Sequence, residues 1–254
     1  MFDFASSLPT EHVVLIAAFA LIAGLARGFS GFGAALIFVP LASSLIGPKL
    51  AAPLLLIVDG IAASGLIPNA LGRADIRGVA VMAIGAIVGI PLGTALLALV
   101  SPLTVRWFIA AMVTGLLVLL LSGWRYSGRR PPLLTVAVGW MSGMFTGAAG
   151  AGGPPVVAYW LGTGSDGAKV RANIVMFFAF GTLVTTVSYT VGGLFQWSLV
   201  PLAWAATPLY GLGLFTGSRL FGKASDRTYR WICYGLIAGA TIISLPVLDP
   251  LLRS

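Results

Sequence analysis

This 254-residue chain has few of the residues on which soluble proteins and enzymes depend. Charged residues make up 9% of it, whereas soluble domains have roughly 25%. Its single cysteine, Cys233, excludes an intrachain disulfide, and its single histidine, His12, leaves no cluster of metal ligands. Convergent acids, histidines and cysteines for acid–base or nucleophilic chemistry are also lacking. The sequence therefore argues against an enzyme, and it predicts no catalytic residues, no metal and no cofactor.

Long apolar runs dominate the chain instead. Hydrophobic residues make up 58% of it, and the mean hydropathy is +1.01. The runs at 79–100 and 107–124 contain no charge, and each is near the roughly 20 residues that cross a bilayer core. One such run could be the core helix of a soluble protein. Their recurrence along the whole chain predicts an all-α polytopic membrane protein.

The breaks between apolar runs divide the chain into ten helical segments within a single transmembrane domain, 1–254. The expected bounds are 12–28, 32–46, 49–69, 76–100, 104–123, 132–147, 154–163, 168–192, 198–221 and 229–248. No Lys or Arg precedes the first segment, unlike the start of a cleavable signal peptide, so we expect this segment to be retained.

Two halves of the chain resemble each other on either side of the joint at 124–132. Repeat 1 spans about 12–123 and repeat 2 about 132–248. The motif at 101–107 recurs at 225–231. At the same spacing, three glycines of the first half match three of the second, namely Gly89, Gly93 and Gly115 with Gly213, Gly217 and Gly239. We therefore expect an internal duplication with five segments in each half.

The basic residues are unevenly distributed among the breaks. Suppose that the chain changes side at every segment, or that the first two segments of each half form a re-entrant pair that makes no net crossing. Eleven cations then share one side: Arg73, Arg77, Arg125, Arg129, Arg130, Lys169, Arg171, Arg219, Lys223, Arg227 and Arg230. The other side has three: Lys49, Arg106 and Arg253.

Since Lys and Arg gather in cytoplasmic loops, the richer side is expected to be cytoplasmic. Both termini are then periplasmic in a bacterial cytoplasmic (inner) membrane, and the two repeats are inverted. The net charge of +8 becomes an orientation signal, so the expected partner is the lipid bilayer and not nucleic acid.

Two glycine-rich breaks, 27–33 and 143–153, interrupt apolar sequence without a charged loop. Pro154 and Pro155 suit the first turn of a new helix, whose free amides would favour an anion. The alternative is that the glycines only allow helices to pack closely. Two equivalent breaks in inverted repeats favour a substrate site, as in secondary transporters.

Candidate substrate-binding residues come from both breaks and from one later helix. Arg27 directly precedes a break, and its planar guanidinium group suits an oxyanion, unless the side chain snorkels to an interface. Ser30, Thr146 and Asn173 could add neutral hydrogen bonds, although hydroxyls in membrane helices more often bond their own backbone. The remaining candidates are glycines of the breaks: Gly28, Gly31, Gly33, Gly147, Gly150, Gly152 and Gly153.

Asp59 is the one acid well inside an expected span. Intramembrane carboxylates often carry protons or bind ions, so we predict an ion-coupling role for it. The alternatives are a permanent ion pair with Arg27 and a neutral, hydrogen-bonded acid.

Three segments, GFSGFGAALIFVPLA, GPKLAAPLLLIVDG and MFTGAAGAGGPPVVAYWL, resemble the TauE/SafE sulfite exporter family, and the resemblance covers essentially the whole chain. It implies a carrier of a small anionic substrate: sulfite, thiosulfate or a small organosulfonate, with a small carboxylate as the alternative. A passive anion channel stays open, and so does assembly as a homodimer.

Overall fold

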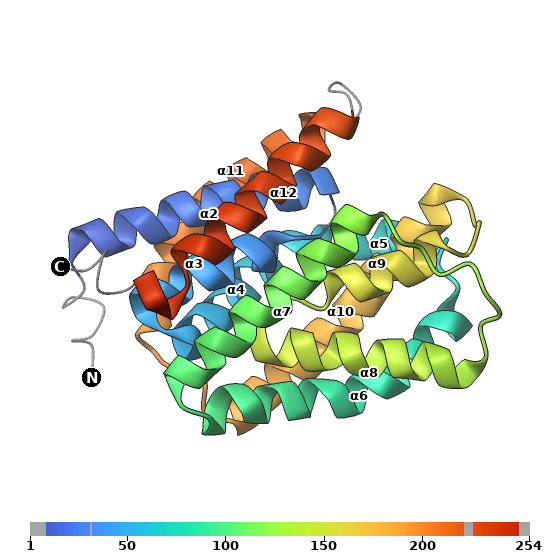
Figure 1. Cartoon of the computed structure of the whole chain (residues 1–254), viewed down its shortest axis with the longest axis horizontal. Coiled ribbons are helices and arrows are strands. Elements are labelled where there is room, and N and C mark those ends of the chain that lie inside the picture. The colour runs from blue at the N-terminus through green and yellow to red at the C-terminus, as the bar shows by residue number, and fades with distance from the viewer. Residues whose placement is uncertain (1–8, 31, 221–225, 249–254) are drawn as a thin grey trace.

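The computed structural model describes residues 9–30, 32–220 and 226–248, and these residues form helices and no strand (Figure 1). Six helices are long and apolar enough to cross a membrane: Thr10–Gly28, Ile76–Leu99, Pro102–Ser122, Pro132–Ala149, Gly167–Val191 and Leu199–Arg219. The prediction of an all-α polytopic membrane protein is therefore confirmed.

The helices follow the expected order of segments. The first half contains α2 (Thr10–Ser30), α3 (Ala34–Ile46), α4 (Pro48–Ala63), η1 (Ser64–Leu66), α5 (Ile67–Leu71), α6 (Ile76–Leu99) and α7 (Pro102–Ser122). The second half contains α8 (Pro132–Ala149), α9 (Gly153–Leu161), α10 (Gly167–Val191), α11 (Leu199–Leu220), α12 (Asp226–Ile243) and η2 (Pro246–Leu248).

The third expected segment, 49–69, differs from the structure, which divides it among α4, η1 and α5. Pro68 has no N–H to donate to the carbonyl of Ser64, and its ring crowds that carbonyl, which disfavours a regular helix through this turn. The chain tightens into a short 3-10 turn at Ser64–Leu66 instead.

Helix starts and ends follow local sequence signals. The carboxylate of Asp75 accepts a hydrogen bond from the N–H of Gly78 at the start of α6. The hydroxyl of Ser101 accepts one from the N–H of Thr104 at the start of α7. Such caps satisfy amides that have no partner within the first turn of a helix. Gly123, with φ of 61°, ends α7 in a left-handed conformation.

Two helix pairs pack at very short distance: α6 with α8, and α2 with α11 (Figure 1). A Cβ on Gly89 or Gly147 would lie 2.1 Å from a carbonyl oxygen across the α6–α8 seam. A Cβ on Gly28 would lie 2.2 Å, and one on Gly217 2.3 Å, from a carbonyl oxygen across the α2–α11 seam. Only glycine allows backbones to approach so closely.

Each seam joins the first long helix of one half to the fourth expected segment of the other. Gly89 and Gly93 of α6, which match Gly213 and Gly217 of α11 in the sequence, lie in corresponding seams. A two-fold relation between the halves predicts this reciprocal exchange. The inverted orientation of the repeats stays a prediction.

Basic residues lie at both ends of α6. Arg77 is in its first turn, and the ammonium group of Lys49 donates a hydrogen bond of 2.6 Å to the carbonyl of Ala98 near its last. These ends are roughly 30 Å apart at 1.5 Å per residue. Arg130 and Lys169 line the same cavity as Arg77. Arg77, Arg130 and Lys169, which the sequence count places on one side of the membrane, therefore meet at one end of α6. Lys49 lies at the other end of this helix.

The membrane side of each end remains a prediction. Four of the counted cations cannot be placed in this way, because Lys223 and Arg253 lie outside the described residues, as do the side chains of Arg227 and Arg230.

Candidate functional site

Both glycine-rich breaks interrupt helices, as the sequence predicts. The first separates α2 from the 13-residue α3, which begins after Gly33, a glycine with φ of 102°. The second separates α8 from the nine-residue α9 through Gly150, with φ of 68°. These φ values are unfavourable for residues with a side chain. α3 and α9, at roughly 20 Å and 14 Å long, are each too short to cross a hydrocarbon core of about 30 Å. Each break therefore lies inside the protein.

Hydroxyl groups hold the second break in shape. Ser142 donates a hydrogen bond of 2.6 Å to the carbonyl of Gly152, and Tyr189 donates one of 2.9 Å to the carbonyl of Gly147. The hydroxyl of Thr146 donates to the carbonyl of Ser142, one turn earlier in its own helix. Such bonds satisfy backbone groups that a broken helix would leave unpaired inside a membrane.

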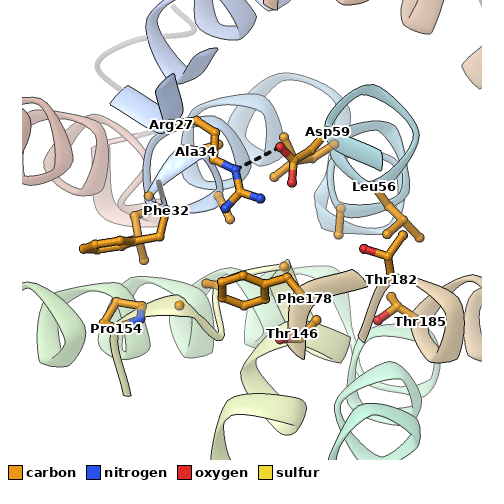
Figure 2. A pocket seen from close by; sticks show the side chains of 18 of the residues that line it. Arg27, Phe32, Ala34, Leu56, Asp59, Thr146, Pro154, Phe178, Thr182 and Thr185 are labelled. Atoms are coloured by element: carbon orange, nitrogen blue, oxygen red, sulfur yellow. Dashed lines mark ion pairs between the residues drawn. The ribbon is translucent and has the colours of Figure 1, made fainter. Parts of the chain in front are cut away.

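The two breaks meet at a cavity of about 70 Å³, several times the roughly 10–15 Å³ that one water needs. Arg27 and Asp59 lie on one side of it and come from the first half of the chain (Figure 2). Thr146, Pro154 and Phe178 lie on the opposite side and come from the second half. The cavity is therefore built at the junction of the two halves.

The N-termini of two short helices border this cavity. Gly33 and Ala34 at the start of α3 line it, as do Ala151 and Gly153 at the start of α9. Neither helix start has a side chain that caps its amides. Because the first amides of a helix carry partial positive charge, both helix ends favour an anion in the cavity.

Arg27 and Asp59 form an ion pair within the wall of the cavity. The Nε of Arg27 lies 3.1 Å from Oδ1 of Asp59, and the two side chains are 14% and 27% exposed. The hydroxyl of Tyr210, on α11, donates a hydrogen bond of 2.5 Å to the same oxygen. The guanidinium carbon also lies 5.6 Å from the ring centre of Phe178. Arg27 is thus directed into the protein and does not extend to an interface.

Six of the predicted site residues line the cavity together: Arg27, Gly33, Asp59, Thr146, Gly150 and Gly153. Gly28 and Gly147 lie instead in the helix seams, and Gly152 lies close to Ser142 and Thr146 of its own half. Gly31 and the side chain of Ser30 lie outside the described residues.

Asn173 is not brought to the cavity. Its side-chain oxygen accepts a hydrogen bond of 2.7 Å from the N–H of Asp75, next to the start of α6. The side chain is 1% exposed, so it joins α10 to the start of α6. This structural role accounts for a polar group that the sequence alone suggested for anion binding.

Sequence reasoning missed the contribution of α10 to the cavity. Phe178, Thr182, Thr185 and Tyr189 all line it. Their spacing of three or four residues places them on one face of the helix. A polar stripe at helical spacing within an apolar segment was the signal that could have revealed them. Tyr210 carried no comparable signal, because its contact with Asp59 joins residues from different halves.

The fold and this site define a class: a polytopic helical membrane protein with a polar cavity where two interrupted helices meet, which is the plan of secondary transporters. The family model for the sulfite exporter TauE/SafE matches residues 16–244. The chain belongs to this family of membrane transporters, which confirms the resemblance seen in the sequence motifs. No curated protein and no solved structure matched the chain significantly.

Proposed function

We propose that this protein is a secondary transporter that carries a small sulfur-containing anion, such as sulfite, thiosulfate or an organosulfonate, by alternating access. The observation that carries the proposal is the cavity between the halves, where the N-termini of α3 and α9 lie beside Arg27. Two helix dipoles and one cation attract an oxyanion. Membership of the family supports the sulfur-containing class.

The anion would compete with Asp59 for the guanidinium group of Arg27. In Figure 2 this group lies beside Asp59 and faces the wall that holds Phe178 and Thr146, so an oxyanion in the cavity would be close to both charges. Two negative charges that share one cation favour protonation of one of them. We therefore propose that Asp59 takes up a proton when the anion binds, so that anion and proton move together.

Exchange between the two membrane sides would follow from the two halves. Cavity residues on one wall belong to the first half and those on the other wall to the second. Movement of one repeat against the other would open the cavity to each side in turn, as in carriers built from inverted repeats. Access in this scheme does not require either short helix to unfold.

A liposome assay tests this function. The purified chain is reconstituted, and uptake of sulfite, thiosulfate, taurine, sulfoacetate and lactate is measured at several pH gradients. We expect saturable uptake of at least one sulfur anion, faster when the side of origin is more acidic. Failure to take up any sulfur anion would sink the proposal, and uptake of lactate alone would replace it with carboxylate transport. A rapid, unsaturated current would indicate a channel.

A further inference from the structure

A second cavity, of about 360 Å³, lies away from the proposed transport site. Residues near the N-termini of three helices line it: Arg77 of α6, Thr135 of α8 and Lys169 of α10. Tyr159 and Trp160, near the end of α9, form another part of its wall. Three helix N-termini, which carry partial positive charge, and the C-terminal end of α9, which carries partial negative charge, therefore meet here.

The side chains of this cavity add further positive charge. Arg77 and Lys169 are exposed and Arg130 is half-buried, and all three line it. The one carboxylate among the lining residues, Asp75, already accepts a hydrogen bond from the backbone of Gly78. Within 9–30, 32–220 and 226–248, no salt bridge joins these cations to an acid. The lining of the cavity therefore includes three cations and one acid, whose carboxylate already accepts a hydrogen bond.

Buried donors in the wall also point to a ligand. Trp160 is 5% exposed, and its indole Nε1 has no acceptor among the described residues. Arg130 donates from one terminal nitrogen to the carbonyls of Tyr126 and Gly162, while its buried Nε likewise has no acceptor within the described chain. A buried donor without an acceptor is costly. An anion in the cavity would offer acceptors to these groups if the side chains turned toward it.

Two helices connect this cavity to the transport site. α9 begins with Gly153 and Pro154 at the transport site, and Trp160, next to its last residue, lines the second cavity. Trp160 is six positions after Pro154, a rise of roughly 9 Å along the helix. α10 likewise contributes Lys169 to the second cavity and Phe178 to the first. An anion in the second cavity would thus be one short helix away from the transport site.

We infer that this basic cavity is a second oxyanion site, where the transported anion binds before it enters, or after it leaves, the cavity between the halves. Arg77, Arg130 and Lys169 would supply the charge. The inference rests on the proposed function for the identity of the anion. Positive orientation charges alone do not explain the site, because Arg73 and Arg171 are nearby in the sequence and do not line the cavity.

Calorimetric titration of the purified full-length protein tests the inference. Sulfite, taurine and inorganic phosphate are titrated separately into protein in phosphatidylcholine nanodiscs. We expect two sulfur anions per chain in the wild type. The variant Arg77→Gln/Lys169→Gln, changed at exposed positions, should bind one, with affinity for the second lowered at least tenfold. Arg73→Gln/Arg171→Gln makes the same charge change at exposed positions outside the cavity and should bind two.

Several results would overturn the inference: one anion per wild-type chain, two in the cavity variant, or an equal loss in the control variant. Nanodiscs that contain phosphatidylglycerol test whether the oxyanion is a lipid headgroup and not a free anion. Binding of this lipid that depends on Arg77 and Lys169, without binding of free sulfite or taurine there, would make the cavity a lipid headgroup site. Because titration needs no transport, two bound anions without flux would contradict only the proposed function.

Discussion

The guanidinium group of Arg27 contacts one carboxylate and also borders the cavity in which we propose that the anion binds. Its Nε contacts Asp59, while its central carbon lies 5.6 Å from the ring centre of Phe178. Such a group has five N–H donors in a fixed plane, so one edge can hold a carboxylate while another binds an oxyanion. A lysine has the same charge but cannot provide two such edges.

We therefore expect Arg27→Lys to fold and to transport with a KM raised about tenfold or more. Hydrogen bonds to charged groups contribute about 1.5–3 kcal/mol, and 1.4 kcal/mol corresponds to a tenfold change in affinity. Initial uptake rates of the best sulfur anion measure the change. An unaltered KM would show that Arg27 does not bind the anion.

Asp59→Asn should remove the pH dependence of transport. An amide resembles the protonated acid in shape but cannot exchange a proton, so uptake should vary little with pH while the wild type speeds up as the pH falls. Uptake rates at matched anion concentration across several pH values measure this. A pH profile equal to that of the wild type would exclude the coupling role.

Tyr210→Phe should lower the initial rate of transport, because the change removes the hydroxyl that helps to hold the carboxylate of Asp59 beside Arg27. Initial uptake rates of the best sulfur anion measure the change. Tyr234→Phe is the matched control, because Tyr234 donates to the carbonyl of Leu120 and does not line either cavity. Equal rates for Tyr210→Phe and the wild type would show that this hydrogen bond does not contribute to transport.

Single residues show where sequence reasoning succeeds and where it ends. Arg27 and Asp59 stand out because a charge inside apolar sequence is costly and therefore informative. Asn173 stood out for the same kind of reason, yet its partner is the backbone of Asp75, 98 positions away in the chain. Local sequence identifies an unusual polar group but not its partner.

Glycine residues allow the helices of each seam to pack closely. In the α6–α8 seam, Gly85, Gly89 and Gly93 each face the backbone of α8. Lys49 has a structural role between helices, because it joins the start of α4 to the last turn of α6. A cation at the end of a helix also balances the negative end of its dipole.

Gly89→Ala should destabilise the protein, because the new Cβ would lie 2.1 Å from the carbonyl oxygen of Trp140. Overpacking of this kind costs about 1–3 kcal/mol. Gly115→Ala on α7 is the control, since a Cβ there would meet nothing within 4 Å. Thermal unfolding in detergent should give a Tm several degrees lower for Gly89→Ala and unchanged or higher for Gly115→Ala. Equal Tm values would mean that the seam relaxes without cost.

Across the whole molecule, basic residues are distributed unevenly between the two ends of the helix bundle. Arg77, Arg130 and Lys169 gather at one end of the bundle, and Lys49 lies at the far end of α6. The positive-inside rule then assigns the first end to the cytoplasm. With this assignment we expect both termini to be periplasmic.

A reporter enzyme that is active only in the periplasm tests this topology in a bacterial host. Fused after Ser254, it should be active. Inserted within the joint at 124–132, it should be inactive, because this joint lies on the predicted cytoplasmic side. The opposite pair of results would reverse the topology, and activity at both positions would exclude an odd number of crossings in the second half.

The class of fold, the family and the two helix breaks could all be predicted from the amino-acid sequence. Hydropathy, glycine and proline act locally: apolar length decides which segments enter a membrane, and Gly33 or Gly150 decides where a helix stops. Only the tertiary structure decided which polar groups meet. It placed Tyr210 on Asp59, the stripe of α10 in the cavity, and Gly28 and Gly147 in seams. Such contacts join distant parts of the chain, and they depend on how whole helices pack.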